Sequence, residues 1–131
     1  MSGLLNNLSR LNQFIPLGLA LTEMLRHDIT DIELREWSLW GNNGTYDSDG
    51  GKIVLYRDMD KAKIIEMVQR RHGLLLTEAD CNVYVLLHEC GHAKDRDHLK
   101  VPYIDRFDAE LRADEYALKR LEEWKRANRG N

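Results

Sequence analysis

Apolar residues recur at helical spacing in four stretches of the chain. The stretches are residues 4–27, residues 58–72, the residues from 77 to about 94, and residues 108–126. Pro16 falls inside the first stretch, where it either breaks the run or begins a second helix. Gly73 ends the second stretch, and Thr77 is a good N-cap for the third. The pattern predicts a mainly helical chain.

Residues 31–56 have turn signals and β-forming residues in place of helical spacing. Asn42-Asn43-Gly44 and residues 47–51 are typical turn sequences, and residues 52–56 contain three consecutive residues with strong β preference. We therefore predict a small antiparallel sheet in this part of the chain. Residues 30–33 also match a helix capping box, so a helical start there is the alternative.

The two tryptophans of this region, Trp37 and Trp40, are large apolar side chains near the predicted strands. Ile32 and Leu34 are out of phase with Trp37, so the alternation does not place all of them on one face. We expect Trp37 and Trp40 to pack in the core or on the face of the sheet.

The stretch HECGH, from His88 to His92, lies in the third predicted helix and fits the pattern HExxH. Residues four apart share one helix face, so His88 and His92 can direct two imidazoles at one metal ion. Glu89 is adjacent to the first ligand and can take a proton from an attacking water without occupying a coordination position. Gly91 is unusual inside a helix and predicts the close approach of a neighbouring element.

An acidic pair in the last predicted helix can complete such a site. Glu110 and Asp114 lie four residues apart in ELRADEYALKRL, so they share a helix face. Glu110 can act as the third ligand, and Asp114 can accept a hydrogen bond from the far nitrogen of a ligand histidine. The alternative is an ordinary acidic face exposed to solvent.

His98 is a rival for the third ligand position. It lies six residues after His92, the spacing at which metzincins place their third histidine. The metzincin pattern needs Gly where this chain has Asp95, and all four methionines precede the HECGH motif, so no Met-containing turn follows it. We therefore prefer Glu110.

HECGH followed by ELRADEYALKRL resembles the ImmA/IrrE-type metallopeptidases of the gluzincin group. Members carry His-Glu-x-x-His and then an acidic helix reading Glu-x-x-Ala-Asp or Asn. The segment GTYDSDGGKIVLY resembles the hairpin before their metal helix, so the resemblance covers roughly residues 37–121. It implies a zincin fold with one zinc ion and a peptidase activity, often directed at a repressor. This chain departs from the family by its helical segment at residues 60–72, and we expect no appended helix-turn-helix or sensor domain.

Composition limits the remaining possibilities. A length of 131 residues predicts one domain, residues 1–131. The formal net charge is −3 and no polybasic tract occurs, which gives no reason to expect a nucleic-acid partner. Residues 14–21 are too few to cross a membrane, so we expect neither a signal peptide nor a membrane span. Cys81 and Cys90 face opposite sides of one helix and cannot pair, which favours a reducing, cytoplasmic location.

These features together predict a compact α+β zincin, in which a small antiparallel sheet packs on helices that include the metal helix and the C-terminal ligand helix. The expected function is zinc-dependent hydrolysis of peptide bonds in an intracellular protein, with Glu89 as the base. His98, Tyr103 and Arg106 are candidate donors to the oxyanion, and the strand at residues 52–56 can bind an extended peptide at its edge. The alternatives are a catalytically silent regulator that binds a partner and an amide hydrolase with a non-peptide substrate. The oligomeric state stays open.

Overall fold

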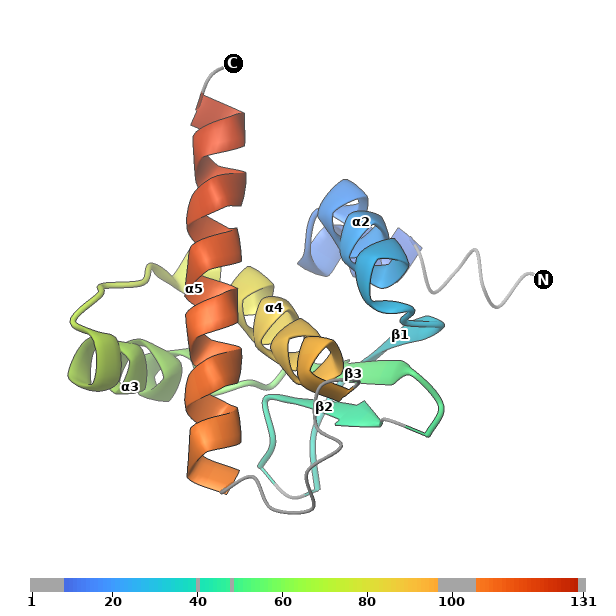
Figure 1. The fold of residues 1–131 in the computed structure, drawn as a ribbon, viewed down its shortest axis with the longest axis horizontal. Coiled ribbons are helices and arrows are strands. Elements are labelled where there is room, and N and C mark those ends of the chain that lie inside the picture. Colours follow the sequence, from blue (N-terminus) through green and yellow to red (C-terminus); the bar gives the residue numbers. More distant parts are fainter. Residues whose placement is uncertain (1–8, 40, 48, 97–105, 130–131) are drawn as a thin grey trace.

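The computed structural model describes residues 9–39, 41–47, 49–96 and 106–129 (Figure 1). Its labelled elements are α2 (Leu17–His27), β1 (Asp31–Arg35), β2 (Gly44–Asp47), β3 (Lys52–Tyr56), α3 (Lys61–His72), α4 (Glu78–Arg96) and α5 (Arg106–Arg129). Residues 9–14 are also helical, and Pro16 separates them from α2, for which it is the N-cap. The fold is therefore α+β, as predicted. None of the helices in these ranges combines the length and the apolar character that a membrane span requires.

The three strands form a mixed sheet in the order β1–β3–β2. β2 and β3 are an antiparallel hairpin, in which Gly44 lies opposite Leu55. β1 runs parallel to β3, with Ile32 opposite Ile53, so the prediction of an antiparallel sheet is wrong for this strand. The physical reason is the route of the chain. After β1 it passes to the far edge of the sheet, and the hairpin then returns β3 into the middle, in the direction of β1.

The first strand orients its apolar residues toward the core. Ile32 and Leu34 are only 3% and 4% exposed, and their alternation with half-buried neighbours is that of a strand, so the helical alternative for this region is wrong. Trp37 comes two residues after β1 ends, where the chain has left the sheet, and it is 63% exposed. The prediction that Trp37 packs in the core is therefore also wrong. Trp40 lies outside the described residues.

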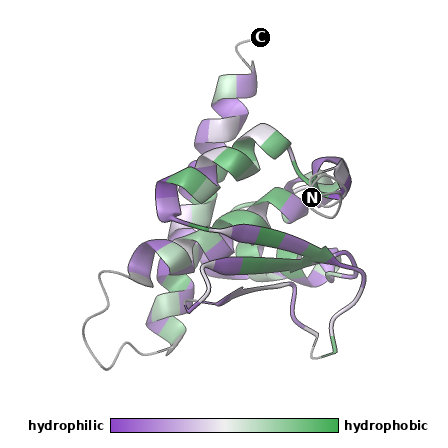
Figure 2. Ribbon diagram, turned by 90° about the vertical axis from the view of Figure 1, so that its right-hand side faces the viewer, coloured by the Kyte–Doolittle hydropathy of each residue, from purple (hydrophilic) through white to green (hydrophobic). Residues whose placement is uncertain are grey.

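α4 is the central element of the structure and lies between the sheet, α2 and α5 (Figure 1). Its apolar stripe is buried in the main hydrophobic core; the buried members are Val83, Leu86, Leu87 and Cys90. Figure 2 shows hydrophobic and hydrophilic residues alternating along α5, and the strands likewise contain both kinds of residue. A helix that is covered on several sides is held by packing more than by its own propensity.

α4 and α5 approach each other most closely at Gly91. A Cβ atom added to Gly91 would lie 2.8 Å from the Cα of Ala113 and 3.2 Å from its Cβ. Such distances are far below van der Waals contact, and the obstructing atoms belong to a helix backbone that cannot rotate aside. Glycine here and alanine on the facing helix therefore set the separation of the two helices, which confirms the close approach predicted from Gly91.

A buried carboxylate fastens α2 to α5. The side chain of Glu23 is fully buried and accepts hydrogen bonds from the Tyr116 hydroxyl at 2.7 Å and from Nε of Arg120 at 2.8 Å. His27 Nε2 lies 3.0 Å from the same carboxylate. Burial alone would raise the pKa of Glu23, but these three partners outweigh it and lower the pKa to about 2. Glu23 is therefore ionised at all physiological pH values.

Gly91→Ala is expected to destabilise the protein by about 2 kcal/mol, because the new methyl group collides with the α5 backbone. Alanine has a higher helix propensity than glycine by about 1 kcal/mol, and this gain partly offsets the collision. The measured change in unfolding free energy is therefore smaller than the cost of the collision itself. Gly18→Ala in α2 is the matched control, since its Cβ would meet nothing within 4 Å and should stabilise the fold slightly. Denaturant unfolding of the three proteins tests this, and equal stabilities for wild type and Gly91→Ala would contradict it.

Glu23 should make the stability of the fold depend on acid pH. Its pKa is lowered from 4.5 to about 2 on folding, so its contribution is present above pH 4.5 and disappears as the pH falls toward 2. The shift corresponds to about 3 kcal/mol. We expect Glu23→Gln to flatten the pH dependence of the unfolding free energy in this window. Glu66→Gln, which removes an exposed ion pair with Arg70, should leave that dependence unchanged, and a similar effect of both variants would refute the assignment.

Candidate metal centre

The helix that carries HECGH begins at a reciprocal cap. The backbone N–H of Asp80 donates to Thr77 Oγ1 at 3.2 Å, and the N–H of Thr77 donates to Asp80 Oδ2 at 3.0 Å. The same carboxylate oxygen of Asp80 accepts from Lys125 Nζ of α5 at 2.8 Å. This arrangement confirms Thr77 as the N-cap, and it ties the start of α4 to the far end of α5.

The structure brings His88, His92 and Glu110 together at the contact between α4 and α5. Nε2 of His88 lies 2.9 Å from Glu110 Oε2, and Nε2 of His92 lies 3.2 Å from Glu110 Oε1. The two imidazole rings are nearly perpendicular, with centroids 4.9 Å apart. One atom from each of the three side chains lies within 4.8 Å of the others, so a single metal ion could contact all three.

Asp114 lies behind His88 and is fully buried. Its Oδ1 is 2.9 Å from Nδ1 of His88, a short contact whose alignment is poor for a hydrogen bond, and accepts from the Tyr84 hydroxyl at 2.9 Å. Its Oδ2 is 3.0 Å from His72 Nε2 and 3.3 Å from Arg71 Nη1. Asp114 therefore lies at the far nitrogen of His88, where the sequence predicts it, while Nε2 of the same ring lies beside Glu110.

Three partners of Asp114, namely Arg71, His72 and Tyr84, are not among the site residues predicted from the sequence. His72 contacts Asp114 from the last turn of α3. Nothing in the local pattern of α3 indicates this contact, because it depends on how α3 packs. Tyr84, by contrast, could have been predicted from the sequence, because it lies four residues before His88 and therefore on the same face of α4.

Carboxylates dominate the electrostatics of the centre. Burial alone would lower the pKa of His88, but its contacts with Asp114 and Glu110 outweigh burial and raise that pKa to about 10. The contacts of Glu110 with His88 and His92 lower the pKa of Glu110 well below its usual range. The donor set therefore favours a positive charge between the imidazoles and Glu110, which is the position where a cation would fit.

Glu89 is buried beside the three candidate ligands. It is 7% exposed, and burial raises the pKa of its carboxyl even though His88 and His92 act in the opposite direction. The side chain lies under β2, where a Cβ added to Gly44 would come within 3.3 Å of the Cγ of Glu89. Glu89 thus has the position predicted for a proton acceptor, adjacent to the candidate metal ligands.

A cleft of about 770 Å³ opens over the centre. Residues of β2 and the segment before it form one wall, and the apolar side chains Ile64, Met67 and Val85 contribute another. β1 and β2 are the two outer strands of the described sheet, whereas β3 is paired on both sides. The prediction that the strand at residues 52–56 lies at an edge is therefore wrong. Among the described strands, β2 is the edge strand that lines the cleft, because the hairpin places it outermost.

The candidate donors to the oxyanion are not located. His98 and Tyr103 lie outside the described residues, and so does the side chain of Arg106 at the start of α5. The rival assignment of His98 as third ligand therefore has no counterpart in the described part of the chain, where Glu110 lies beside both histidines.

Comparison of the chain with protein-family models, with curated proteins and with solved structures finds no match. The case for the site therefore depends on its own geometry. Two imidazole nitrogens and one carboxylate, oriented by a buried aspartate, are donors that suit a divalent transition-metal ion. The His88–His92–Glu110 group could hold such an ion.

Glu110→Ala is expected to release bound metal, because it removes one of three donors and leaves two imidazoles alone. We expect its affinity for zinc to fall at least about a hundredfold. Glu115→Ala is the matched control, since Glu115 lies on the same helix and belongs to no group of candidate ligands among the described residues. His98→Ala should also retain the ion.

Metal content after dialysis against a weak chelator gives the measurement for all three variants. Loss of the ion from His98→Ala, with retention in Glu110→Ala, would reverse the choice of third ligand.

Proposed function

We propose that this chain is a zinc-dependent metallopeptidase of the gluzincin type. One observation carries the proposal: His88, His92 and Glu110 offer ligand atoms within 4.8 Å of one another, and Glu89 is buried next to them. A set of two histidines and one glutamate leaves a position open for a reactant, and it is used by catalytic zinc sites, whereas structural sites close all four positions. The resemblance of HECGH and ELRADEYALKRL to ImmA/IrrE-type peptidases supports the same conclusion.

A zinc ion, when bound, would supply Lewis acidity that polarises a scissile carbonyl and makes water more acidic. The residues of this chain would supply the proton transfers. Glu89 would accept a proton from the attacking water and later deliver it to the leaving nitrogen. Its burial suits this task, because a raised pKa brings a carboxyl closer to the range in which it can both accept and return a proton near neutral pH.

The neighbours of the ligands would keep the site in its reactive geometry. Asp114 contacts the far nitrogen of His88, and it is itself held by Tyr84 and His72, so the imidazole cannot rotate freely. A ligand that is fixed before the substrate arrives loses little conformational freedom on reaction. These contacts support a catalytic site over an accidental cluster of acidic and basic groups, because an accidental cluster has no need of a buried orienting carboxylate.

The cleft suits an extended peptide. β2, an outer strand of the described sheet, lines it, and an extended peptide can bind beside such a strand by backbone pairing. Ile64, Met67 and Val85 give it an apolar wall for a substrate side chain. α3 supplies Ile64 and Met67, and this helix occupies the segment in which the chain departs from the ImmA/IrrE pattern. We therefore propose that the substrate is a regulatory protein, the class that such peptidases cut.

Glu89→Gln is expected to retain zinc and the fold but to lose hydrolysis, because an amide cannot accept the proton. The loss should reach at least about a hundredfold in turnover. The most informative measurement is a proteome-wide search for new N-termini in cells that express the wild type or the variant, since it tests activity and identifies the substrate together. Glu78→Gln, an exposed substitution in the first turn of the same helix, is the matched control and should behave as wild type.

Full turnover by Glu89→Gln on a verified substrate would refute the assigned role of Glu89. Recovery of one partner by both proteins, without any cleavage of it, would instead favour a regulator that binds and does not cut. New products without new N-termini would point to an amide that is not a peptide bond.

A further inference from the structure

The last turn of α3 reaches the buried carboxylate that lies behind His88. Nε2 of His72 is 3.0 Å from Oδ2 of Asp114, and Nη1 of Arg71 is 3.3 Å from the same oxygen. The other oxygen, Oδ1, faces α4, where it is 2.9 Å from the Tyr84 hydroxyl and 2.9 Å from Nδ1 of His88. The two oxygens of Asp114 are therefore divided between α3 and α4, although Asp114 itself belongs to α5.

The packing of α3 determines where its last turn lies. Ile64, Val68 and His72 follow one another at intervals of four residues, so they share a helix face. Ile64 and Val68 are 2% and 0% exposed and belong to the hydrophobic core. Gly73 ends the helix in the left-handed conformation, with φ of 69°, and its N–H donates to the carbonyl oxygen of Gln69 at 2.9 Å. The buried face of α3 therefore places His72 beside the candidate metal centre.

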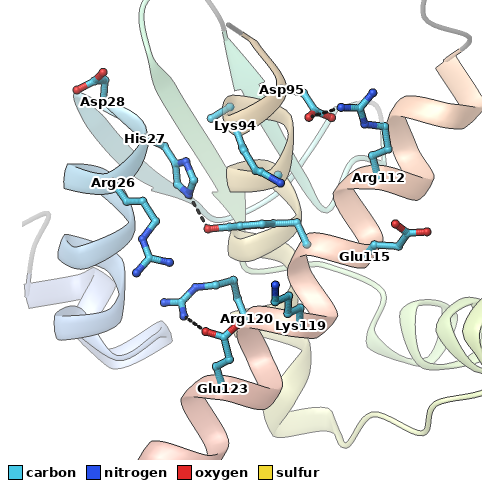
Figure 3. Close-up of a pocket in the computed structure, with 13 residues that line it drawn as sticks. Arg26, His27, Asp28, Lys94, Asp95, Arg112, Glu115, Lys119, Arg120 and Glu123 are labelled. Carbon is cyan, nitrogen blue, oxygen red and sulfur yellow. Dashed lines mark hydrogen bonds and ion pairs between the residues drawn. The ribbon is translucent and has the colours of Figure 1, made fainter. Parts of the chain in front are cut away.

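Other polar contacts of α5 do not orient the Asp114 carboxylate. Figure 3 shows two of them, in which Arg112 pairs with Asp95 of α4 at 3.1 Å and Arg120 pairs with Glu123 at 2.9 Å. In the described part of the chain, the polar partners of the Asp114 side chain come from α3 and α4 alone. Without the donors from α3, Oδ2 would be a buried acceptor that has lost its partners, which is unfavourable.

The rotation of this carboxylate matters to His88. Nδ1 of His88 is buried, and no described residue offers it a well-aligned hydrogen bond. Oδ1 of Asp114 is close enough to accept one, so a small rotation of the carboxylate decides whether the bond forms. A ligand imidazole binds metal more tightly when a carboxylate accepts its far N–H, because the bond fixes the ring and makes the ligand nitrogen more basic.

We propose that His72 and Arg71 are positioning residues for the metal centre. They hold Asp114 in the rotation that serves His88, so a helix that supplies no ligand sets part of the affinity for the metal ion. His72 is the stronger partner, because its side chain is 14% exposed and lies nearer to the oxygen, whereas that of Arg71 is 28% exposed. This inference rests on the metal centre of the proposed function, but it does not require hydrolysis.

The zinc affinity of the whole chain, measured by competition with a chromophoric chelator, tests these roles. We expect His72→Ala to weaken the affinity about tenfold, the lower end of the range for residues behind a metal ligand. His72→Gln should retain most of the affinity, since its amide can donate to the carboxylate. Arg71→Ala should have a smaller effect than His72→Ala. Arg70→Ala, which removes an exposed ion pair with Glu66, is its matched control and should bind zinc as wild type does.

A double substitution shows whether His72 acts through Asp114. Asp114→Asn should itself weaken zinc binding, and His72→Ala added to it should change the affinity by less than about twofold, because the carboxylate that His72 orients is gone.

Val68→Ala separates this role from packing. It removes buried methyl groups from the same face of α3, so it should lower the unfolding temperature of the metal-free chain. Its zinc affinity should match that of the wild type, because it leaves the contacts of His72 with Asp114 in place. The visible absorption spectrum of the cobalt-loaded proteins reports the ligand geometry, and we expect it to change in His72→Ala and not in Val68→Ala.

Equal zinc affinities of wild type and His72→Ala would overturn the proposal. Independent effects of His72→Ala and Asp114→Asn would do the same, as would a loss of affinity in Val68→Ala as large as that in His72→Ala. If His72→Ala does not fold, Arg71→Ala with and without Asp114→Asn gives the same comparison. A wild type without zinc affinity would refute the metal centre and the proposed function together, whereas zinc binding without cleavage of any protein would count against the proposed function alone.

Discussion

The close packing of α4 on α5 at Gly91 is the constraint on which the candidate centre depends. His88 and His92 flank Gly91 on one helix, and Glu110 precedes Ala113 by three residues on the other. Glu110 can approach both imidazoles, at 2.9 and 3.2 Å, only while the helix backbones remain at the separation that a glycine permits. Gly91, which has no side chain, therefore sets the distances among the candidate ligands. A change in the packing of α4 on α5 would also change the geometry of the ligands.

Asp114 links the same contact to the rest of the structure. Burying a carboxylate is strongly unfavourable unless it is paired and hydrogen-bonded. Here the penalty is offset by groups from α3 and α4, among them His72, Tyr84 and His88, which lower the pKa of Asp114 to about 2 against the effect of burial. Because the carboxylate needs all of these partners, the position of α3 and the orientation of a candidate ligand are determined together.

Much of the candidate centre could be predicted from the sequence because its spacing is local. Residues four apart on a helix share a face whatever the tertiary structure, so His88 with His92, and Glu110 with Asp114, were identifiable as pairs. That the two pairs meet depends on tertiary packing, and Gly91 was the one residue in the sequence that indicated a close helix contact there. His72 illustrates the limit: its role depends on the docking of α3, and no periodic pattern records that.

The errors in the fold have the same physical origin. The β2–β3 hairpin follows from its turn residues, which act between neighbours in sequence. The parallel pairing of β1 depends instead on the path of the chain after Arg35. The alternation of apolar and polar residues shows which face of a strand is buried, but it does not show this path. Trp37 was misplaced for this reason, since its apolar character suggested the core while the route of the chain carried it into solvent at 63% exposure.

Two buried carboxylates hold α5 in place from different directions. Glu23 of α2 accepts hydrogen bonds from Tyr116 and Arg120 of α5, and Asp114 of α5 contacts Tyr84 and His88 of α4. In both cases the partners lower the pKa of the carboxyl to about 2 against the effect of burial. A buried carboxylate without such partners would be strongly unfavourable, so α5 can pack in this position only while both sets of contacts persist. The helix that supplies Glu110 is therefore positioned by polar contacts with α2 and α4 as well as by the apolar core.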